Sequence, residues 1–174
     1  MEKTKQYEGM IRTAMKETGG RKPVMTVGHG INVEEPHNKK LIPKDVVEGK
    51  RPITDKEDEA AVKANQRIAA SDSDKFGGQG FRKLDKRAQD VVEDMHYNMG
   101  APRMGGFKKL KEATGAGDYR RMADEIRYTD GKTKKKESPY YQQTKGRAKE
   151  HVKTLRDLAD EKELGDEIKR QLER

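Results

Sequence analysis

Apolar residues at helical spacing predict a series of amphipathic helices in the second half of the chain. The strongest stripe follows the spacing i, i+4, i+7, i+8, i+11, i+15 and consists of Leu84, Ala88, Val91, Val92, Met95 and Met99. Positions at this spacing share one face of a helix, so the segment is predicted to be the central core helix. Gly100-Ala101-Pro102 is expected to end it, and further helices are predicted from Phe107 and from Tyr119.

The C-terminal segment has the same periodicity. One face of a predicted last helix carries Ala148, His151, Val152, Leu155 and Leu158. A spacing of four then continues through Leu164, Ile168 and Leu172, which belong either to this helix or to a separate terminal helix. Residues 129–137 include three consecutive lysines and are predicted to form an exposed loop.

The first fifty residues combine short apolar groups with turn residues. An apolar face over residues 1–17 predicts a short helix; its members are Met10, Ile11, Ala14 and Met15. Residues 23–33 alternate loosely around two glycines and predict a small hairpin or sheet. Residues 34–52 contain three prolines and several charges, which are typical of a loop or an irregular strand.

A clear helix start follows at Thr54, because Glu57 three residues later completes the spacing of a capping box. The helix is expected to continue to about Ala70, before a polar, glycine-rich break over residues 71–80.

These elements predict an α+β fold for residues 1–160. A small N-terminal β lobe would cover about residues 17–52, and a larger helical lobe about residues 53–160. Residues 161–174 are predicted to form a charged C-terminal helix or tail.

Composition narrows the possible partners. The 174 residues include 39 Lys+Arg and 31 Asp+Glu, a net charge of +8, and only 30% are hydrophobic, so the core is expected to be thin. The positive charge favours polyanionic partners such as nucleic acid, an anionic membrane surface or an acidic cell wall. Nucleic acid is disfavoured because acidic residues are interspersed with the basic ones and aromatic residues are few. Apolar runs are too short for a membrane span or a signal peptide, and the absence of cysteine excludes disulfides and cysteine chemistry.

Two N-terminal carboxylates are candidates for acid–base chemistry. Glu8 and Glu17 are nine residues apart, which puts them on opposite faces of a helix. They converge only if Glu17 lies past the helix end, where the chain turns back. A carboxylic acid and a carboxylate around one cleft suit the cleavage of a glycosidic bond. The alternative is a pair of solvated surface acids, since the chain has 31 acidic residues. The four histidines show no metal-ligand spacing.

Three blocks in order along the chain resemble the bacteriophage lysozyme family (muramidases). The first is Glu8-Gly9, then Glu17-Thr18, then Thr26-Val27-Gly28-His29-Gly30; the second is Tyr97-Asn98-Met99-Gly100 followed by Gly106-Phe107; the third is Ser138-Pro139-Tyr140-Tyr141-Gln142-Gln143-Thr144 followed by Arg147-Ala148. The resemblance covers residues 7 to about 160 and implies a lysozyme-like fold. In that fold a long helix, beginning near Thr54, joins the β lobe to the helical lobe.

The resemblance implies a role for each matched residue. Glu8 would be the general acid, Glu17 would stand where the family has its catalytic Asp, and Thr26 would help to hold the attacking water. His29, Asn98 and Phe107 would line the sugar-binding cleft, and Arg147 would have a structural or electrostatic role. For three of them there is a simpler alternative: His29 as an exposed turn residue, Asn98 as a helix cap and Arg147 in a surface ion pair. The family's reaction needs no cofactor and no metal.

Two departures from the family pattern leave two functions open. Glu17 replaces Asp, and eight residues separate Glu17 from Thr26, three more than in the family. The first function is a muramidase that cleaves bacterial peptidoglycan between N-acetylmuramic acid and N-acetylglucosamine. The second is a phage virion structural protein whose lysozyme-like domain has weak or no activity and binds other virion proteins. In either case the resemblance implies a phage-encoded protein, made in the host cytoplasm and acting at the wall after release or within the virion.

Overall fold

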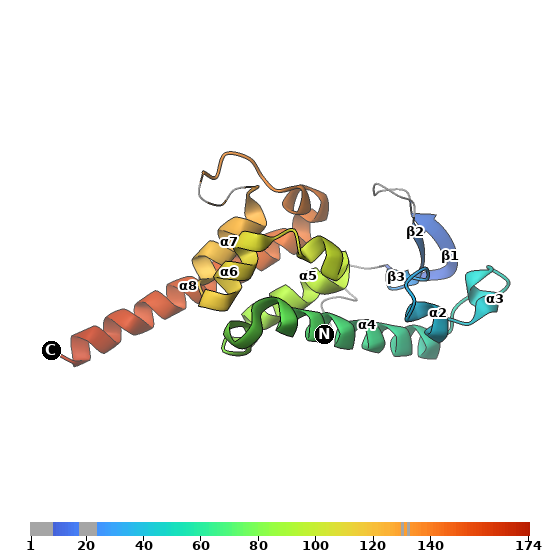
Figure 1. Cartoon of the computed structure of the whole chain (residues 1–174), viewed down its shortest axis with the longest axis horizontal. Coiled ribbons are helices and arrows are strands. Elements are labelled where there is room, and N and C mark those ends of the chain that lie inside the picture. The colour runs from blue at the N-terminus through green and yellow to red at the C-terminus, as the bar shows by residue number, and fades with distance from the viewer. Residues whose placement is uncertain (1–8, 18–23, 130, 132) are drawn as a thin grey trace. The chain divides into compact units, whose positions relative to one another are not determined.

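The chain folds into two compact units, one with a small sheet and one of helices. The computed structural model describes residues 9–17, 24–129, 131 and 133–174. The units comprise residues 1–68 and 69–174, and their boundary lies within the long helix α4 (Asp55–Arg82; Figure 1). The prediction of a mixed α+β fold is confirmed, with helices predominating.

The sheet of the first unit has three antiparallel strands in the order β1-β2-β3. They are β1 (Ile11–Glu17), β2 (Val24–Gly28) and β3 (Ile31–Asn32). The hairpin predicted over residues 23–33 is therefore confirmed by β2 and β3. The helix predicted over residues 1–17 is wrong for residues 11–17, and residues 1–8 lie outside the described residues. A shift in register between Ile11 and Met15 explains the error, because a bulge changes which residues face the core and breaks strict alternation.

Two short helices, α2 (Asn38–Leu41) and α3 (Lys44–Val47), lie in residues 34–52, for which the sequence predicted a loop or an irregular strand. Helix α3 and the residue that follows α2, Ile42, contribute to the core of the first unit, which consists of Val27, Ile31, Val33, Ile42, Val46, Ile53, Ala61 and Val62. Asn65 of α4 donates a hydrogen bond of 2.8 Å to the side-chain oxygen of Asn38, which is itself buried. This pairing satisfies a buried amide and fixes α2 against α4.

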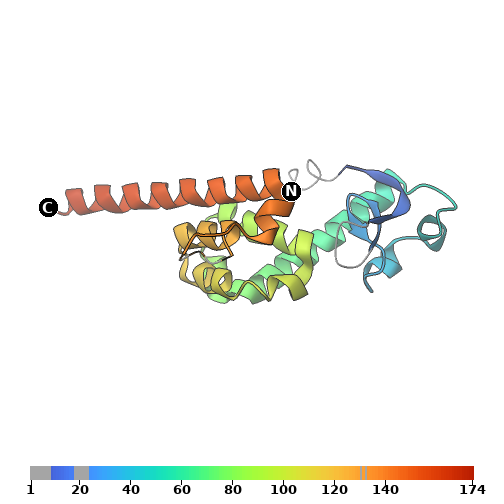
Figure 2. The same ribbon diagram turned by 90° about the horizontal axis from the view of Figure 1, so that it is seen from above.

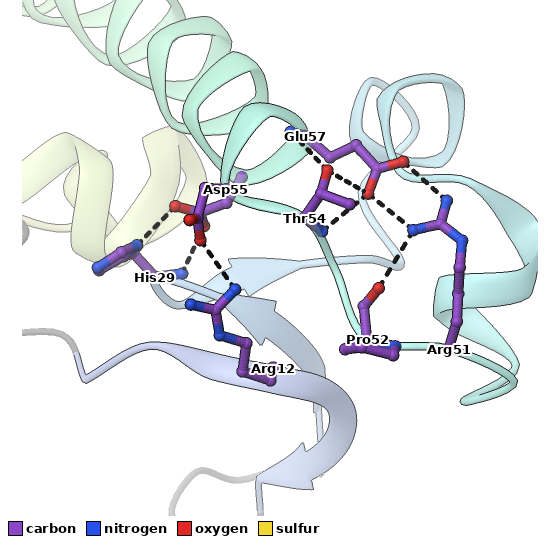
Figure 3. Close-up of polar contacts among 8 residues, drawn as sticks. Arg12, His29, Arg51, Pro52, Thr54, Asp55 and Glu57 are labelled. Carbon is purple, nitrogen blue, oxygen red and sulfur yellow. Dashed lines mark hydrogen bonds and ion pairs between the residues drawn. The ribbon is translucent and has the colours of Figure 1, made fainter.

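The predicted capping box at the start of α4 is confirmed. The Thr54 backbone N–H donates to the Glu57 carboxylate over 2.9 Å, and the Glu57 N–H donates to the Thr54 hydroxyl over 3.3 Å. Arg51 forms two further hydrogen bonds, of 2.7 and 2.9 Å, to the same carboxylate (Figure 3). The Arg51 hydrogen bonds, followed by those from Thr54, lower the pKa of Glu57 to about 2. Close by, Arg12 of β1 donates to Asp55 over 2.8 Å and so ties the sheet to the same helix start.

Replacing Thr54 with alanine is expected to lower the free energy of unfolding by about 1 kcal/mol, the usual cost of losing an N-cap side chain. Urea unfolding followed by circular dichroism measures the change. Lys56→Ala, an exposed position in the same helical turn, is the matched control and should shift stability by less than about 0.5 kcal/mol. Equal stability of the two variants would show that the cap contributes nothing.

The second unit is a helical body around α5 (Lys86–Met104), with α6 (Lys108–Ala116), α7 (Tyr119–Arg127) and α8 (Pro139–Leu172). The predicted stripe on α5 is confirmed, since Ala88, Val91, Val92 and Met95 are all buried. Gly100 has non-helical dihedral angles, so the regular part of α5 ends where the sequence predicted.

The break predicted over residues 71–80 is confirmed at Gly78, whose φ of +57° and ψ of −139° are not helical, so that a kink separates two helical segments within α4. The prediction that the helix ends at about Ala70 is wrong, because residues 71–77 are helical too. Beyond the kink, a Cβ atom on Gly80 would overlap the backbone of Gly115 in α6. This glycine therefore lets the second segment of α4 approach α6 closely.

Helix α8 is continuous from Pro139 to Leu172, so Leu164, Ile168 and Leu172 belong to the last helix and not to a separate one. Ser138 caps its start by accepting a hydrogen bond from the Tyr141 N–H over 3.1 Å. Its final turns continue beyond α6 and α7 (Figures 1 and 2). No helix in the described part of the chain, α8 included, has the length and apolar character that a membrane crossing requires.

Candidate active site

Thr26 occupies an unusual position in the middle strand of the sheet. Its Cα is paired with Met15 of β1 on one side and with Asn32 of β3 on the other. Only 4% of the residue is exposed, yet its hydroxyl oxygen forms no hydrogen bond with the described residues. A buried hydroxyl without a partner costs about 1–3 kcal/mol, a cost that a hydrogen bond to a water or a ligand would remove. Thr26 is therefore suited to holding a small polar molecule.

Of the two candidate carboxylates, Glu8 lies outside the described residues. Glu17 is the last residue of β1, and its backbone pairs with Val24 of β2. The pairing of Met15 with Thr26 lies two residues away along the same ladder. The expected position of Glu17 past the end of a helix is therefore wrong, because Glu17 lies in a strand that pairs with β2.

His29, predicted to line a sugar cleft or to be an exposed turn residue, is held by Asp58 of α4. Its backbone N–H donates to one carboxylate oxygen over 2.9 Å, and its ring Nδ1 lies 2.7 Å from the other (Figure 3). Asp58 is only 2% exposed. Gly28, just before it, has a φ of +63°, and a Cβ there would overlap the Asp58 carboxylate. The turn and the helix are thus fitted to each other, and His29 is not a free surface residue.

In the second unit, two predicted site residues meet at Asp94 of α5. Asn98 donates from its side-chain nitrogen to the Asp94 carbonyl over 2.8 Å and to its carboxylate over 3.1 Å. Arg147 of α8 places Nε 3.5 Å from the same carboxylate, with only 6% of its side chain exposed. Arg147 is thus in a buried ion pair rather than a surface one, and Asn98 is hydrogen-bonded back to the preceding helical turn.

A histidine and a tyrosine extend this cluster. His151 places Nε2 3.1 Å from the Asp94 carboxylate, and its Nδ1 lies 3.3 Å from the Tyr140 hydroxyl. Burial, and then the nearby Asp94 charge, raise the pKa of Tyr140, which therefore stays protonated. Phe107 contacts the Tyr140 ring edge-on, with centroids 6.4 Å apart. We refer to Asp94, Asn98, Tyr140, Arg147 and His151 as the Asp94 cluster.

A separate buried pair joins α4 to α5. His96 places Nδ1 2.9 Å from the Ser73 hydroxyl and 3.0 Å from the Val92 carbonyl, and the ring of Phe76 packs edge-on against it. Burial lowers the pKa of His96. The lowered pKa keeps the ring neutral at physiological pH, because burial disfavours its charged form.

This lowered pKa predicts an acid-sensitive contribution to stability. The unfolded chain binds a proton at His96 below about pH 6.5, where the folded chain does not. The free energy of unfolding is therefore unaffected by protonation of His96 above that pH and falls progressively as the pH drops below it. Urea unfolding from pH 7.5 to 5 should show a shallower loss of stability for His96→Gln than for the wild type. Identical slopes would mean that His96 does not titrate differently in the two states.

Among the described residues, no group of three or more His, Cys, Asp or Glu side chains could hold a metal ion. A scan of protein-family models and a search of curated proteins find no match to this chain. The assignment of function therefore depends on the residues and their geometry. From the sequence alone, neither Asp94 nor His151 was identified as a partner in the site. The signal that could have found them is a spacing of one helical turn, since Asp94 lies four residues before Asn98 and His151 lies four residues after Arg147.

Proposed function

We propose that the protein is a peptidoglycan hydrolase of the lysozyme type, with a lysozyme-like fold. It would cleave the β-1,4 bond between N-acetylmuramic acid and N-acetylglucosamine. The observation that carries the proposal is the buried Thr26 hydroxyl, which has no hydrogen-bond partner among the described residues. The order of the three sequence blocks and the α+β architecture also support it, and the positive charge suits an anionic wall.

The proposed reaction uses two carboxyl groups and one water. Glu8 donates its proton to the glycosidic oxygen, so that the bond to the anomeric carbon breaks as the oxocarbenium-like transition state forms. Thr26 holds the water, and the Glu17 carboxylate accepts a proton from it as its oxygen attacks the anomeric carbon. In a strand, residues two positions apart share a face. In the β1–β2 register, Glu17 lies two residues along β1 from Met15, whose Cα is paired with that of Thr26.

Within the second unit, two side chains have the chemistry to contact a sugar. The Asp94 cluster fixes the Asn98 amide by two hydrogen bonds, which leaves its side-chain oxygen to accept from an N-acetyl N–H of the sugar. Phe107, half-buried against Tyr140, offers an apolar edge for a sugar ring. Arg147 balances the charge of the Asp94 carboxylate that orients Asn98. His29, in the turn that Asp58 holds, would contact the sugar from the first unit.

The activity is tested by incubating the protein with purified, insoluble peptidoglycan and measuring the release of reducing ends. Mass spectrometry of the soluble products should find N-acetylmuramic acid at the reducing end. Anhydro-muramic products would show instead that a muramic 6-hydroxyl replaces the water as nucleophile. No soluble products at all would refute the proposal.

Thr26→Val separates the proposed role from a structural one. Valine keeps the shape but removes the hydroxyl, so the rate should fall by about 10- to 100-fold as the water loses its position. Stability should not fall, because the hydroxyl that is removed has no partner among the described residues. Thr13→Val, an exposed position in β1, is the matched control and should keep the wild-type rate. A fully active Thr26→Val enzyme would rule out the water-holding role.

A further inference from the structure

A groove in the second unit lies between the kinked part of α4 and helix α6. It has a volume of about 510 Å³ and is lined by residues 75–78 of α4 and by Lys108, Lys111, Glu112 and Gly115 of α6. Sites for small ligands typically have volumes of about 300–1,000 Å³ and mainly apolar walls with a few polar groups. None of the lining residues belongs to the Asp94 cluster or to the residues proposed for the reaction, so the groove is a separate candidate site.

Much of the lining is backbone. Gly77 and Gly78 of α4 and Gly115 of α6 contribute no side chains, and Phe76 beside them is only 8% exposed. A Cβ atom on Gly78 would have no neighbour within 4 Å, and one on Gly115 would come no closer than 4.0 Å to the Gly77 carbonyl oxygen. Glycine allows another molecule to approach the backbone closely. The groove can therefore accept a main chain against these glycines.

The charge around the groove is positive. Glu112, the acidic residue of the lining, is already paired with Arg121 over 2.6 Å. No described residue forms an ion pair with Lys108 or Lys111. Residues 95–111 moreover include four Lys or Arg and no Asp or Glu, although the whole chain has 31 acidic residues. The groove therefore favours a ligand that carries negative charge.

The groove also has a direction. Its four α6 residues follow the spacing i, i+3, i+4, i+7 and so share one face of the helix. From residue 108 to residue 115 the helix rises about 10 Å, which is the length of about three residues of an extended chain. On the α4 side, Lys75 is 74% exposed, and its pair with Asp72, at 3.4 Å, is a surface contact. An extended chain along the groove thus has lysines on both sides, whereas a compact ion would fill only part of it.

We propose that the groove between α4 and α6 binds a short acidic peptide in an extended conformation. Its main chain would lie against the glycines. Successive side chains of an extended chain point to opposite sides, so two consecutive carboxylates would reach Lys108 or Lys111 on one side and Lys75 on the other. Ion pairs with exposed lysines are weak, and the dissociation constant is expected to be on the order of 1 mM. This binding does not require the proposed hydrolase activity.

Titration of the isotope-labelled full chain with a blocked alanine–glutamate–glutamate peptide, followed by nuclear magnetic resonance, tests the binding. The amide signals of Gly77, Gly78 and Gly115 should shift, and the dissociation constant should rise with added salt, because exposed charges are screened. The same peptide with glutamine in place of glutamate should bind at least about 5-fold more weakly. Equal binding of the two peptides, or no shift with about 10 mM of the glutamate peptide, overturns the proposal.

Two variants separate the groove from a general attraction of anions. Lys108→Gln/Lys111→Gln should bind the glutamate peptide about 3- to 10-fold more weakly, whereas the charge-matched Lys135→Gln/Lys136→Gln, at exposed positions outside the groove, should bind it as the wild type does. Gly115→Leu should weaken binding at least about 10-fold, because leucine fills the groove; it should not lower stability, since glycine is a poor helix former. Equal weakening by the two lysine pairs, or unchanged binding by Gly115→Leu, overturns the proposal. Inorganic phosphate that binds as tightly as the peptide would show a site for a bare anion and exclude the peptide as its ligand.

Discussion

A Glu8→Gln variant is expected to release reducing ends from purified peptidoglycan about 100- to 10,000-fold more slowly than the wild type. Glu8 is the proposed proton donor, and a positioned general acid contributes a rate factor of this size. Glutamine has nearly the same shape, but its amide cannot supply a proton to the leaving oxygen. The initial rate of reducing-sugar release, at equal protein concentration and pH, gives the comparison.

The control for this variant is Glu34→Gln, which removes the same charge from an exposed position in the first unit. It should keep the wild-type rate, and it corrects for the effect of net charge on binding to an anionic wall. Thermal unfolding of Glu8→Gln should match that of the wild type, which would show that its slower reaction does not result from unfolding of the protein. A Glu8→Gln protein as active as the Glu34→Gln control would remove Glu8 from the mechanism.

The parts of the fold that the sequence predicted well depend on local interactions. The capping box at Thr54 and Glu57 involves residues three apart, and the apolar stripe of α5 follows from helical periodicity alone. Both signals are complete within one segment of the chain, so no knowledge of the tertiary structure is needed to interpret them.

The errors arise where distant segments decide the local structure. The pairs Met10-Ile11 and Ala14-Met15 fit a helical face, but pairing with β2 and a shift in register make this segment a strand. A contact remote in sequence thus overrides a local preference. The glycine-rich break within α4, in contrast, is a local signal, and the kink at Gly78 confirms it.

For the candidate site as well, single residues could be predicted from the sequence, whereas the contacts between distant residues could not. Resemblance singled out Asn98 and Arg147 separately, but only the structure brings them together through Asp94. Arg147 and Asp94 are 53 residues apart, and no periodicity within either helix links them. Likewise, the Asp58 carboxylate that holds His29 comes from a different element. Charged partners of this kind cannot be identified in a sequence with 31 acidic residues.

The Asp94 cluster leads to the second large effect: Asp94→Asn is expected to lower the free energy of unfolding by about 3 kcal/mol. Only 15% of the Asp94 side chain is exposed, and its carboxylate faces Arg147 and His151. Asparagine keeps the shape but removes the negative charge. Removing one partner from a buried ion pair costs about 3–5 kcal/mol, because the remaining charge stays away from water. Urea unfolding at neutral pH measures the loss.

Asp90→Asn provides the matched control, since Asp90 lies one helical turn earlier on α5 and its side chain is 55% exposed beside Lys86. Its ion pair is a surface one, so the change should cost less than about 1 kcal/mol. A double-mutant cycle of Asp94→Asn with His151→Gln should give a coupling energy of about 0.5–3 kcal/mol, as expected for side chains in one network. Equal losses for Asp94→Asn and Asp90→Asn, or strict additivity in the cycle, would mean that α5 and α8 are held together by apolar packing alone.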